Sequence, residues 1–312
     1  MEKVKYSVIV GAYNEEETLN AFYDAMIPVM ESTGESFEII FVNDGSKDKT
    51  EEVARALIEK DKRIRLINFS RNYGQQAGFY CGFNNAHGEA IITMDADLQH
   101  PPATVLEMID KWKQGYEVVH AVRAKQKGIS WFKKWSSKAY AKFLRKITGI
   151  DTPNGACDFK LLDRRVVDII CQMKEHNRFN RNLTLIVGFK QTTVEFECGA
   201  RVAGETKWTF KKLLKYSVNG VIPYSDYPLM LPLKAGIWGL SLSMIAFLTF
   251  IILAICKIHL SIGAWIIPVI STFFSILFVF MGINNMYLSH IYDEAKNRPI
   301  YTIRDKVNFD EE

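Results

Sequence analysis

Two aspartates separated by one residue follow a short apolar run in the first third of the chain. The run covers residues 90–94, and Asp95 and Asp97 come directly after it. Two carboxylates this close together at the end of a strand can bind a hard divalent cation, and such an ion can neutralise a diphosphate. Alone, the pair is weak support for a metal site, because most such pairs are solvated turn residues. Its meaning depends on the elements that position it.

Apolar and β-branched runs alternate with segments of helical spacing over the first 122 residues. The runs predict strands at residues 6–10, 37–42, 64–69, 90–94 and 118–122. The segments between them predict helices at residues 15–30, from 48 or 50 onward, 75–86 and 102–114. This alternation indicates an α/β fold with a mostly parallel, Rossmann-like sheet and helices on both faces.

Polar clusters come directly after four of the predicted strands. In open parallel sheets, ligands bind at the carboxyl ends of the strands, so these clusters should face one crevice. The clusters are Tyr13-Asn14-Glu15, Asn43-Asp44-Gly45, Ser70-Arg71-Asn72 and Asp95-Ala96-Asp97.

Two long segments without a formal charge, residues 235–256 and 260–289, follow this part of the chain. Each exceeds the roughly 20 apolar residues needed to cross a bilayer, so they predict a transmembrane helical hairpin. A buried helical hairpin in an oligomer core is the alternative. Lysines and arginines flank the outer ends, and the positive-inside rule then places the large domain and both termini in the cytoplasm, at the plasma (inner) membrane. The first apolar run contains Lys5, so we expect no signal peptide and a C-terminal, uncleaved anchor.

Residues 118–150 contain no Asp or Glu and nine Lys or Arg residues, interleaved with aromatic residues. This pattern is typical of a helix on a membrane surface. Nucleic-acid binding is the competing interpretation, and the nearby hairpin favours lipid. The five cysteines are widely spaced and include no CxxC pair, so neither a disulfide framework nor a zinc site is predicted.

Seven motifs in order resemble those of glycosyltransferase family 2, and the last three resemble its polyprenyl-phosphate branch, which includes dolichol-phosphate mannose synthase and bacterial undecaprenyl-phosphate glucosyltransferases. The resemblance extends from about residue 5 to the tail. The motifs begin at Val10 (VGAYNEE), Val42 (VNDGS), Ser70 (SRNYG), Asp95 (DADLQHPP), Gly155 (GACDFKLL), Asn177 (NRF) and Arg201 (RVAGETKW).

The resemblance implies a GT-A fold, a nucleotide-sugar donor and Mg²⁺ or Mn²⁺. It also assigns roles by motif position. Residues of the donor site are Tyr13, Glu15, Asp44, Asn72 and Asp95, and the metal ligands are Asp97, Gln99 and Asp95. Ala12 and Gln75 depart from the proline and lysine of many relatives, which leaves the sugar and base contacts open.

The resemblance places Asp158 at the reaction centre, as a base or as a group that orients the substrate. A phosphate-monoester acceptor is already largely a dianion at neutral pH and needs little deprotonation, so both roles stay open. Cationic and polar side chains must hold the acceptor phosphate. The candidates are Arg123, Lys134, Ser137, Arg201 and Lys207.

The predicted activity is inverting transfer of a hexose or N-acetylhexosamine from UDP-glucose or UDP-N-acetylglucosamine to undecaprenyl phosphate, for modification of cell-envelope glycans. Expected partners are membrane lipid, further copies of the chain, a flippase and a downstream membrane glycosyltransferase, with no nucleic acid. A processive polysaccharide synthase and a noncatalytic membrane scaffold are the alternatives. The predicted parts are a catalytic domain (1–165), an acceptor-side segment with amphipathic juxtamembrane helices (166–233), the hairpin (234–290) and a cytoplasmic tail (291–312).

Overall fold

The computed structural model describes residues 4–124, 156–173, 175, 180–197, 255 and 262–309. In the first 124 residues, strands and helices alternate: β1 (Tyr6–Ala12), α1 (Leu19–Glu31), β2 (Phe37–Asn43), α2 (Thr50–Lys60), β3 (Ile64–Phe69), α3 (Gln75–Asn85), β4 (Ala90–Asp95), α4 (Thr104–Lys113) and β5 (Val118–Arg123). The later elements are β6 (Ala156–Asp163), α6 (Arg164–Gln172), α7 (Asn180–Ile186), β7 (Gln191–Phe196), α10 (Ile262–Lys296) and β8 (Ile303–Val307). All five predicted strands and all four predicted helices are confirmed.

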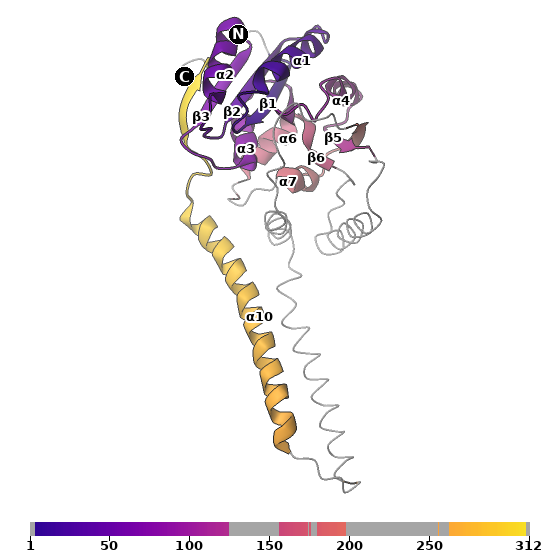
Figure 1. Cartoon of the computed structure of the whole chain (residues 1–312). Coiled ribbons are helices and arrows are strands. Elements are labelled where there is room, and N and C mark those ends of the chain that lie inside the picture. Colours follow the sequence, from indigo (N-terminus) through magenta and orange to yellow (C-terminus); the bar gives the residue numbers. More distant parts are fainter. Residues whose placement is uncertain are drawn as a thin grey trace. The chain divides into compact units, whose positions relative to one another are not determined.

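The strands form one eight-stranded sheet in the order β7-β5-β6-β4-β1-β2-β3-β8. The labelled strands β3, β2, β1, β6 and β5 follow one another from left to right in Figure 1. The pairs β1/β2, β1/β4, β2/β3 and β5/β7 are parallel. The pairs β4/β6, β5/β6 and β3/β8 are antiparallel. Of the eight strands that the structure describes, six run in one direction, so the expectation of a mostly parallel sheet is confirmed. The other two strands, β6 between β4 and β5 and β8 beside β3, run in the opposite direction and make the sheet mixed.

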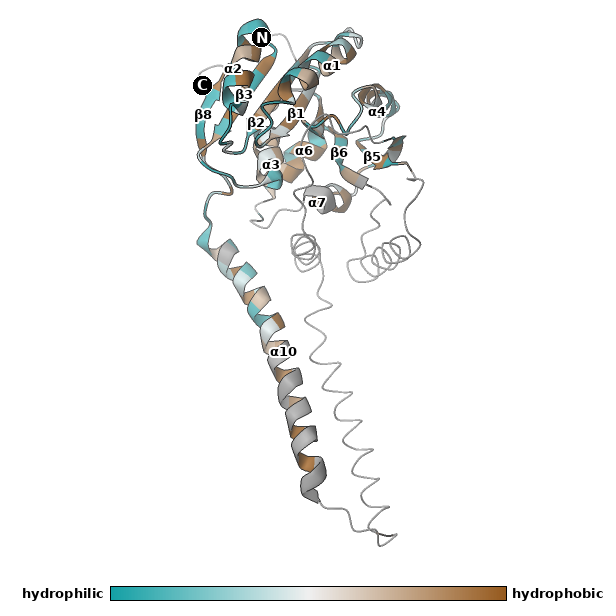
Figure 2. Cartoon of the chain, in the orientation of Figure 1, coloured by the Kyte–Doolittle hydropathy of each residue, from teal (hydrophilic) through white to brown (hydrophobic). Residues whose placement is uncertain are grey.

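Helices cover both faces of the central strands, so these strands are buried on both sides. Within β1, Val8 and Val10 pack into the core that includes residues of α1, α2 and α4. The neighbouring side chain of Ile9 points to the other face, where α3 approaches so closely that a Cβ at Gly82 would lie 2.3 Å from Ile9 Cγ2. Hydrophobic and hydrophilic residues mix along α2, as expected for a surface helix (Figure 2).

Two strands lie beyond the predicted boundary of the catalytic domain at residue 165. β7 pairs with β5 at one edge of the sheet, and β8 pairs with β3 at the other (Figure 1). The compact unit that contains the sheet accordingly comprises residues 1–213 and 299–312. The segment predicted as a cytoplasmic tail thus contributes a strand. β8 has the alternating pattern IRDKV, with charged residues that suit an edge strand.

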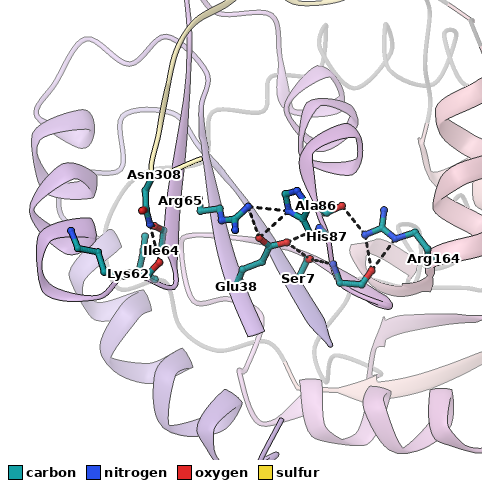
Figure 3. A network of polar contacts seen from close by, with 10 residues as sticks. Ser7, Glu38, Lys62, Ile64, Arg65, Ala86, His87, Arg164 and Asn308 are labelled. Carbon is teal, nitrogen blue, oxygen red and sulfur yellow. Dashed lines mark hydrogen bonds and ion pairs between the residues drawn. The ribbon is translucent and has the colours of Figure 1, made fainter. Parts of the chain in front are cut away.

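A buried carboxylate fastens the amino ends of the central strands. Glu38 at the start of β2 accepts hydrogen bonds from Ser7 Oγ (2.6 Å) and from the backbone N–H of His87 (2.7 Å) (Figure 3). Arg65 forms an ion pair with it at 3.1 Å. Arg164 then donates to the carbonyl oxygens of the turn before β4. This end of the sheet is cross-linked by polar contacts, and the chemistry lies at the opposite end.

Residues 214–298 form a second compact unit. Its described helix, α10, contains 35 residues, and large apolar side chains such as Ile270, Phe273 and Leu277 are about half exposed on it. Among the residues that the structure describes, no helix has the length and apolarity required to span a membrane. The first predicted membrane segment, 235–256, lies almost wholly outside the described residues.

Candidate functional site

The carboxyl ends of four parallel strands lie at the same end of the sheet, which is called here the carboxyl end. β1, β2, β3 and β4 end at Ala12, Asn43, Phe69 and Asp95. β6 runs in the opposite direction, so Asp158, near the start of β6, lies at the carboxyl end of the sheet as well. The predicted convergence of the polar clusters is therefore confirmed for the part of the sheet that carries the acidic residues.

Asp95 and Asp158 are neighbours across adjacent strands. β4 and β6 pair with Thr93 opposite Lys160, and continuing this antiparallel register by two residues sets Asp158 opposite Asp95. The hydroxyl of Thr93 also donates to the backbone oxygen of Asp158 at 2.6 Å. Burial, and then the negative charges of Asp97 and Asp158, raise the pKa of Asp95 to about 7. The structure thus brings together three of the sequence-predicted acids.

Two adjacent amides at the start of α3 hold these two aspartates. Gln75 Nε2 donates to Asp95 Oδ1 at 2.5 Å, and Gln76 Nε2 donates to Asp158 Oδ2 at 3.3 Å. Both glutamines are in the first turn of the helix, after Gly74, whose φ of 96° turns the chain into the helix. Because an amide carries no charge, these contacts orient the carboxylates and leave their negative charge in place. Gln75 was noted in the sequence as a departure from lysine, and Gln76 was missed.

His100 supports the backbone of the acidic loop. Its Nδ1 accepts a hydrogen bond from the N–H of Asp95 at 3.3 Å, and its ring stacks on Phe159 with centroids 4.8 Å apart. Burial lowers the pKa of His100 to about 4, and the positive charge of Arg123 acts in the same direction. The ring is therefore neutral, with its proton on Nε2, because Nδ1 must accept. His100 belongs to the Asp95 motif, but no pattern in the sequence points to its role.

The low pKa of His100 predicts a loss of stability in acid. Between pH 6.5 and about 4, the unfolded chain binds a proton at His100 and the folded chain does not, so falling pH favours unfolding. The loss amounts to about 3 kcal/mol over that range. In His100→Gln the side chain still offers an acceptor oxygen but does not titrate. We expect the difference in unfolding free energy between wild type and His100→Gln to shrink as pH falls from 7 to 4.5, measured by denaturant unfolding at each pH. A constant difference would contradict this assignment.

Asp44 fastens one loop of the site to another. Its carboxylate oxygens accept hydrogen bonds from the N–H groups of Tyr73 (2.6 Å) and Gly74 (2.8 Å), and its own N–H donates to the oxygen of Ala12. Burial raises the pKa of Asp44, while these two backbone bonds oppose the rise. Asn72 Nδ2 donates to the Asp44 backbone oxygen at 3.3 Å. The role of Asp44 in nucleoside binding stays a prediction, and the observed contacts give it a structural role as well.

The loop after β1 is held against the loop after β2. Asn14 adopts a left-handed φ of 55°, its N–H donates to Ser46 Oγ, and its Oδ1 accepts from the N–H of Lys47. The N–H of Glu15 donates to Thr50 Oγ1 at 2.8 Å. Tyr13 and Glu15, the predicted donor contacts, therefore flank a residue whose conformation is set by the neighbouring loop.

Gly45 is the point at which the loops after β2 and β3 meet most closely. Its φ is +65°, and a Cβ there would lie 2.5 Å from the carbonyl carbon of Arg71. Gly34→Ala is a matched control, because Gly34 has a φ of +70° and nothing within 4 Å of the added Cβ. We expect the control to lose about 1–2 kcal/mol of stability from backbone strain. Gly45→Ala should lose about 1–3 kcal/mol more from the clash. Equal losses in chemical denaturation of the two variants would show that the loops separate without cost.

The acidic residues suit a divalent cation by charge. Asp97, Asp158 and Glu15 all raise the pKa of Asp95, and a cation would offset this repulsion. Within the part of the chain that the structure describes, no three His, Cys, Asp or Glu side chains are arranged to hold an ion by themselves. Mg²⁺ is commonly bound by one or two carboxylates together with substrate phosphates, so a site with Asp95 and Asp97 is compatible with such an ion, and their role as ligands stays a prediction. Gln99 donates its N–H to Asp97 Oδ1, and its side chain as a ligand stays a prediction.

One of the predicted acceptor-phosphate residues lies within the described residues. Arg123 is the last residue of β5, and β5 runs parallel to β4, so Arg123 lies at the same end of the sheet as Asp95. The side chain of Arg123 is exposed. The others, Lys134, Ser137, Arg201 and Lys207, lie outside the described residues.

Comparison with known proteins gives a family match over half of the chain. The model described as "Glycosyl transferase family 2" matches residues 7–170. The chain is 43% identical over 305 residues to "Uncharacterized glycosyltransferase YkcC" of Bacillus subtilis (strain 168), with 96% of this chain and 94% of the relative covered. It is 32% identical over 318 residues to "Prophage bactoprenol glucosyl transferase homolog" of Escherichia coli (strain K12), with 96% and 99% covered. A solved structure of glucosyl-3-phosphoglycerate synthase from Mycobacterium tuberculosis with Mn²⁺ and UDP-glucose is similar at a TM-score of 0.46 and 16% identity, over 69% of this chain and 76% of that one.

Proposed function

The chain belongs to glycosyl transferase family 2, and from this premise we propose that it transfers glucose from UDP-glucose to a polyprenyl phosphate of the bactoprenol type. The names of the relatives support glucose and bactoprenol, and UDP is the nucleotide of the two donors that the sequence analysis expects. UDP-N-acetylglucosamine is the second donor to compare. The alternatives of a processive synthase and a noncatalytic scaffold are less consistent with relatives named as bactoprenol glucosyl transferases over nearly their full length.

The observation that carries this proposal is the pair of aspartates across β4 and β6. Asp95 ends β4 and Asp158 lies near the start of β6, and because these adjacent strands run in opposite directions, both aspartates lie at the same end of the sheet. Burial, and then the negative charges of Asp97 and Asp158, raise the pKa of Asp95 to about 7. A cluster of this kind is unfavourable for folding and is therefore expected where it serves binding or catalysis.

In the proposed reaction, these carboxylates divide the work. Asp95 and Asp97 would hold Mg²⁺ or Mn²⁺, which when bound neutralises the diphosphate of the donor. Asp158, 8% exposed and oriented by Gln76, would lie beside the anomeric carbon and stabilise the positive charge that develops there. Arg123 would bind the acceptor phosphate. The oxygen of this phosphate forms the new bond to the sugar as the bond to the UDP oxygen breaks, so no proton must be removed from a largely dianionic acceptor.

The test is transfer by the full-length protein in detergent. Purified protein is incubated with undecaprenyl phosphate, Mn²⁺ and, in parallel, radiolabelled UDP-glucose, UDP-N-acetylglucosamine and GDP-mannose. We expect label in the lipid fraction with UDP-glucose, and none when undecaprenyl phosphate or Mn²⁺ is omitted. Absence of labelled lipid with every donor would contradict the proposed function, whereas labelling from another donor would correct only the identity of the donor.

We also propose that residues 234–290 anchor the enzyme in the membrane with the catalytic domain on the cytoplasmic side. The proposal is supported by the uncharged segments 235–256 and 260–289 and by the cations that flank them. Cysteines introduced singly at Ser261 and Ser289 would be tested with a membrane-impermeant maleimide on intact cells. We expect labelling at position 261, two residues after the connection formed by residues 257–259, and none at 289; the reverse pattern would invert the topology.

A further inference from the structure

The strand β8 makes a buried polar connection into the centre of the sheet. Asp305, in the middle of β8, accepts a hydrogen bond from Asn68 Nδ2 at 2.9 Å. Asn68 Oδ1 in turn accepts from Asn43 Nδ2 at 2.8 Å. Asn68 is 0% exposed and Asn43 is 3% exposed. A carboxylate at the sheet edge is therefore linked to two buried amides at the ends of β3 and β2.

The connection continues to the loops of the proposed donor site. Asn43 Oδ1 accepts from the N–H of Ser46 at 3.0 Å, and Ser46 Oγ accepts from the N–H of Asn14 at 3.0 Å. Asn14 lies between Tyr13 and Glu15 and has a left-handed backbone. Four successive hydrogen bonds thus join β8 to the loop that carries two predicted donor contacts.

The Asp305 carboxylate fixes the orientation of the amides in this series of hydrogen bonds, which runs from Asp305 through Asn68, Asn43 and Ser46 to Asn14 and is called here the relay. An ionised carboxylate can only accept, so Asn68 must turn its NH₂ group toward Asp305 and its oxygen toward Asn43. The same constraint then turns the oxygen of Asn43 toward the N–H of Ser46. Arg55 holds Asp305 in place through an ion pair at 2.6 Å. Without an acceptor at the edge, either amide could rotate, and the loop would lose its fixed partner.

A second contact joins β8 to the neighbouring loop. The N–H of Ser70 donates to the backbone oxygen of Thr302 at 3.0 Å, and Tyr301 stacks on Phe69 with centroids 5.2 Å apart. The loop that begins at Ser70 contains Tyr73, whose N–H binds Asp44. Both loops that surround Asp44 therefore have contacts to β8 or to the residues just before it.

We propose that β8 is a positioning element of the donor site, and that Asp305 acts through Asn68 and Asn43 to fix the loops at Ser46 and Asn14. The effect on the donor rests on the proposed function, whereas the effect on the loops does not. Asp305 itself touches no substrate. Its role is to keep the donor-side loops in one arrangement before the nucleotide binds.

Asn308 provides a matched control on the same segment. Asn308 Nδ2 donates to the backbone oxygens of Lys62 (2.8 Å) and Ile64 (2.7 Å), at the opposite end of β3 (Figure 3). Asn308→Ala therefore loosens the attachment of β8 without breaking the relay. Asp305→Ala breaks the relay, and Asp305→Asn retains an oxygen that can accept from Asn68.

The experiment compares these variants as full-length protein in detergent. Hydrogen exchange is measured for residues 13–16 and 43–48 without ligand, and affinity is measured by titration with UDP and Mn²⁺. For Asp305→Ala we expect exchange in both segments to become about tenfold faster and UDP binding about tenfold weaker, the factor that corresponds to one lost hydrogen bond to a charged group. Asn308→Ala should leave both values near wild type, and Asp305→Asn should restore most of the loss.

Equal effects of Asp305→Ala and Asn308→Ala would overturn the proposal, because the strand would then act only through general stability. Unchanged exchange in Asp305→Ala would overturn it as well. If wild type fails to bind UDP, the proposed UDP-sugar donor is contradicted, and exchange alone still decides whether the relay exists. Should Asp305→Ala not fold, Asp305→Ser serves in its place, since the shorter hydroxyl does not reach Asn68.

Discussion

Asp158→Asn is expected to lower the turnover of sugar transfer by about 10³-fold, within the range typical for loss of a catalytic carboxylate. The substitution keeps the shape of the side chain and removes its negative charge. Gln76 Nε2, which donates to Asp158 Oδ2 at 3.3 Å, can still donate to the oxygen of an asparagine. The measurement is the kcat for labelled polyprenyl phosphate, together with the Kd of UDP and Mn²⁺. The Kd should change little, because Asp158 acts on the sugar side.

Asp168→Asn is the control for this change, since Asp168 is an exposed aspartate on α6. It should retain wild-type turnover. An Asp158→Asn enzyme with turnover near wild type would remove Asp158 from the reaction centre.

Asp97→Ala is expected to lower the rate of transfer at about 1 mM Mn²⁺ by about 10²-fold or more, because the site loses the metal. Asp97 is only partly buried, and its carboxylate is one of the charges that raise the pKa of Asp95 to about 7. Removing it leaves Asp95 as the single acidic ligand of the pair. The measurement is the Mn²⁺ concentration that gives half-maximal transfer, which should rise by about the same factor.

The control here is Asp110→Ala, an exposed aspartate of α4 that lies outside the acidic cluster. Excess Mn²⁺ should partly restore transfer by Asp97→Ala, and it should not restore transfer by Asp158→Asn. Turnover by Asp97→Ala that needs no more Mn²⁺ than wild type would refute the assignment of Asp97 as a ligand.

The sequence predicts the first half of the sheet well because its strands and helices alternate locally. β1 to β5 are short apolar runs stopped by turn residues, and each helix between them has a regular apolar spacing. β6, β7 and β8 were not predicted, since none repeats that unit. β8 contains five residues with three charges, and only its pairing with β3 makes it a strand.

The same distinction applies to the site. The motifs identify the three aspartates Asp95, Asp97 and Asp158, and the structure brings them together at the carboxyl end of the sheet. The contacts that support these residues were not predictable, because Gln76 donates to Asp158 and His100 stacks on Phe159 across long separations in sequence. A glutamine in a first helical turn has no motif of its own, and its function appears only when β6 places Asp158 beside it.

Because β8 completes the sheet, the enzyme is finished late in its own synthesis. Residues 303–307 leave the ribosome after both long apolar segments have been made, whereas β1 to β7 are available much earlier. Until residues 303–307 have been synthesised, the edge of β3 in the nascent catalytic domain therefore has no strand paired with it. If β8 sets the donor loops, a chain still in translation should bind nucleotide weakly, and competence would arrive only once the hydrophobic part of the polypeptide has been delivered.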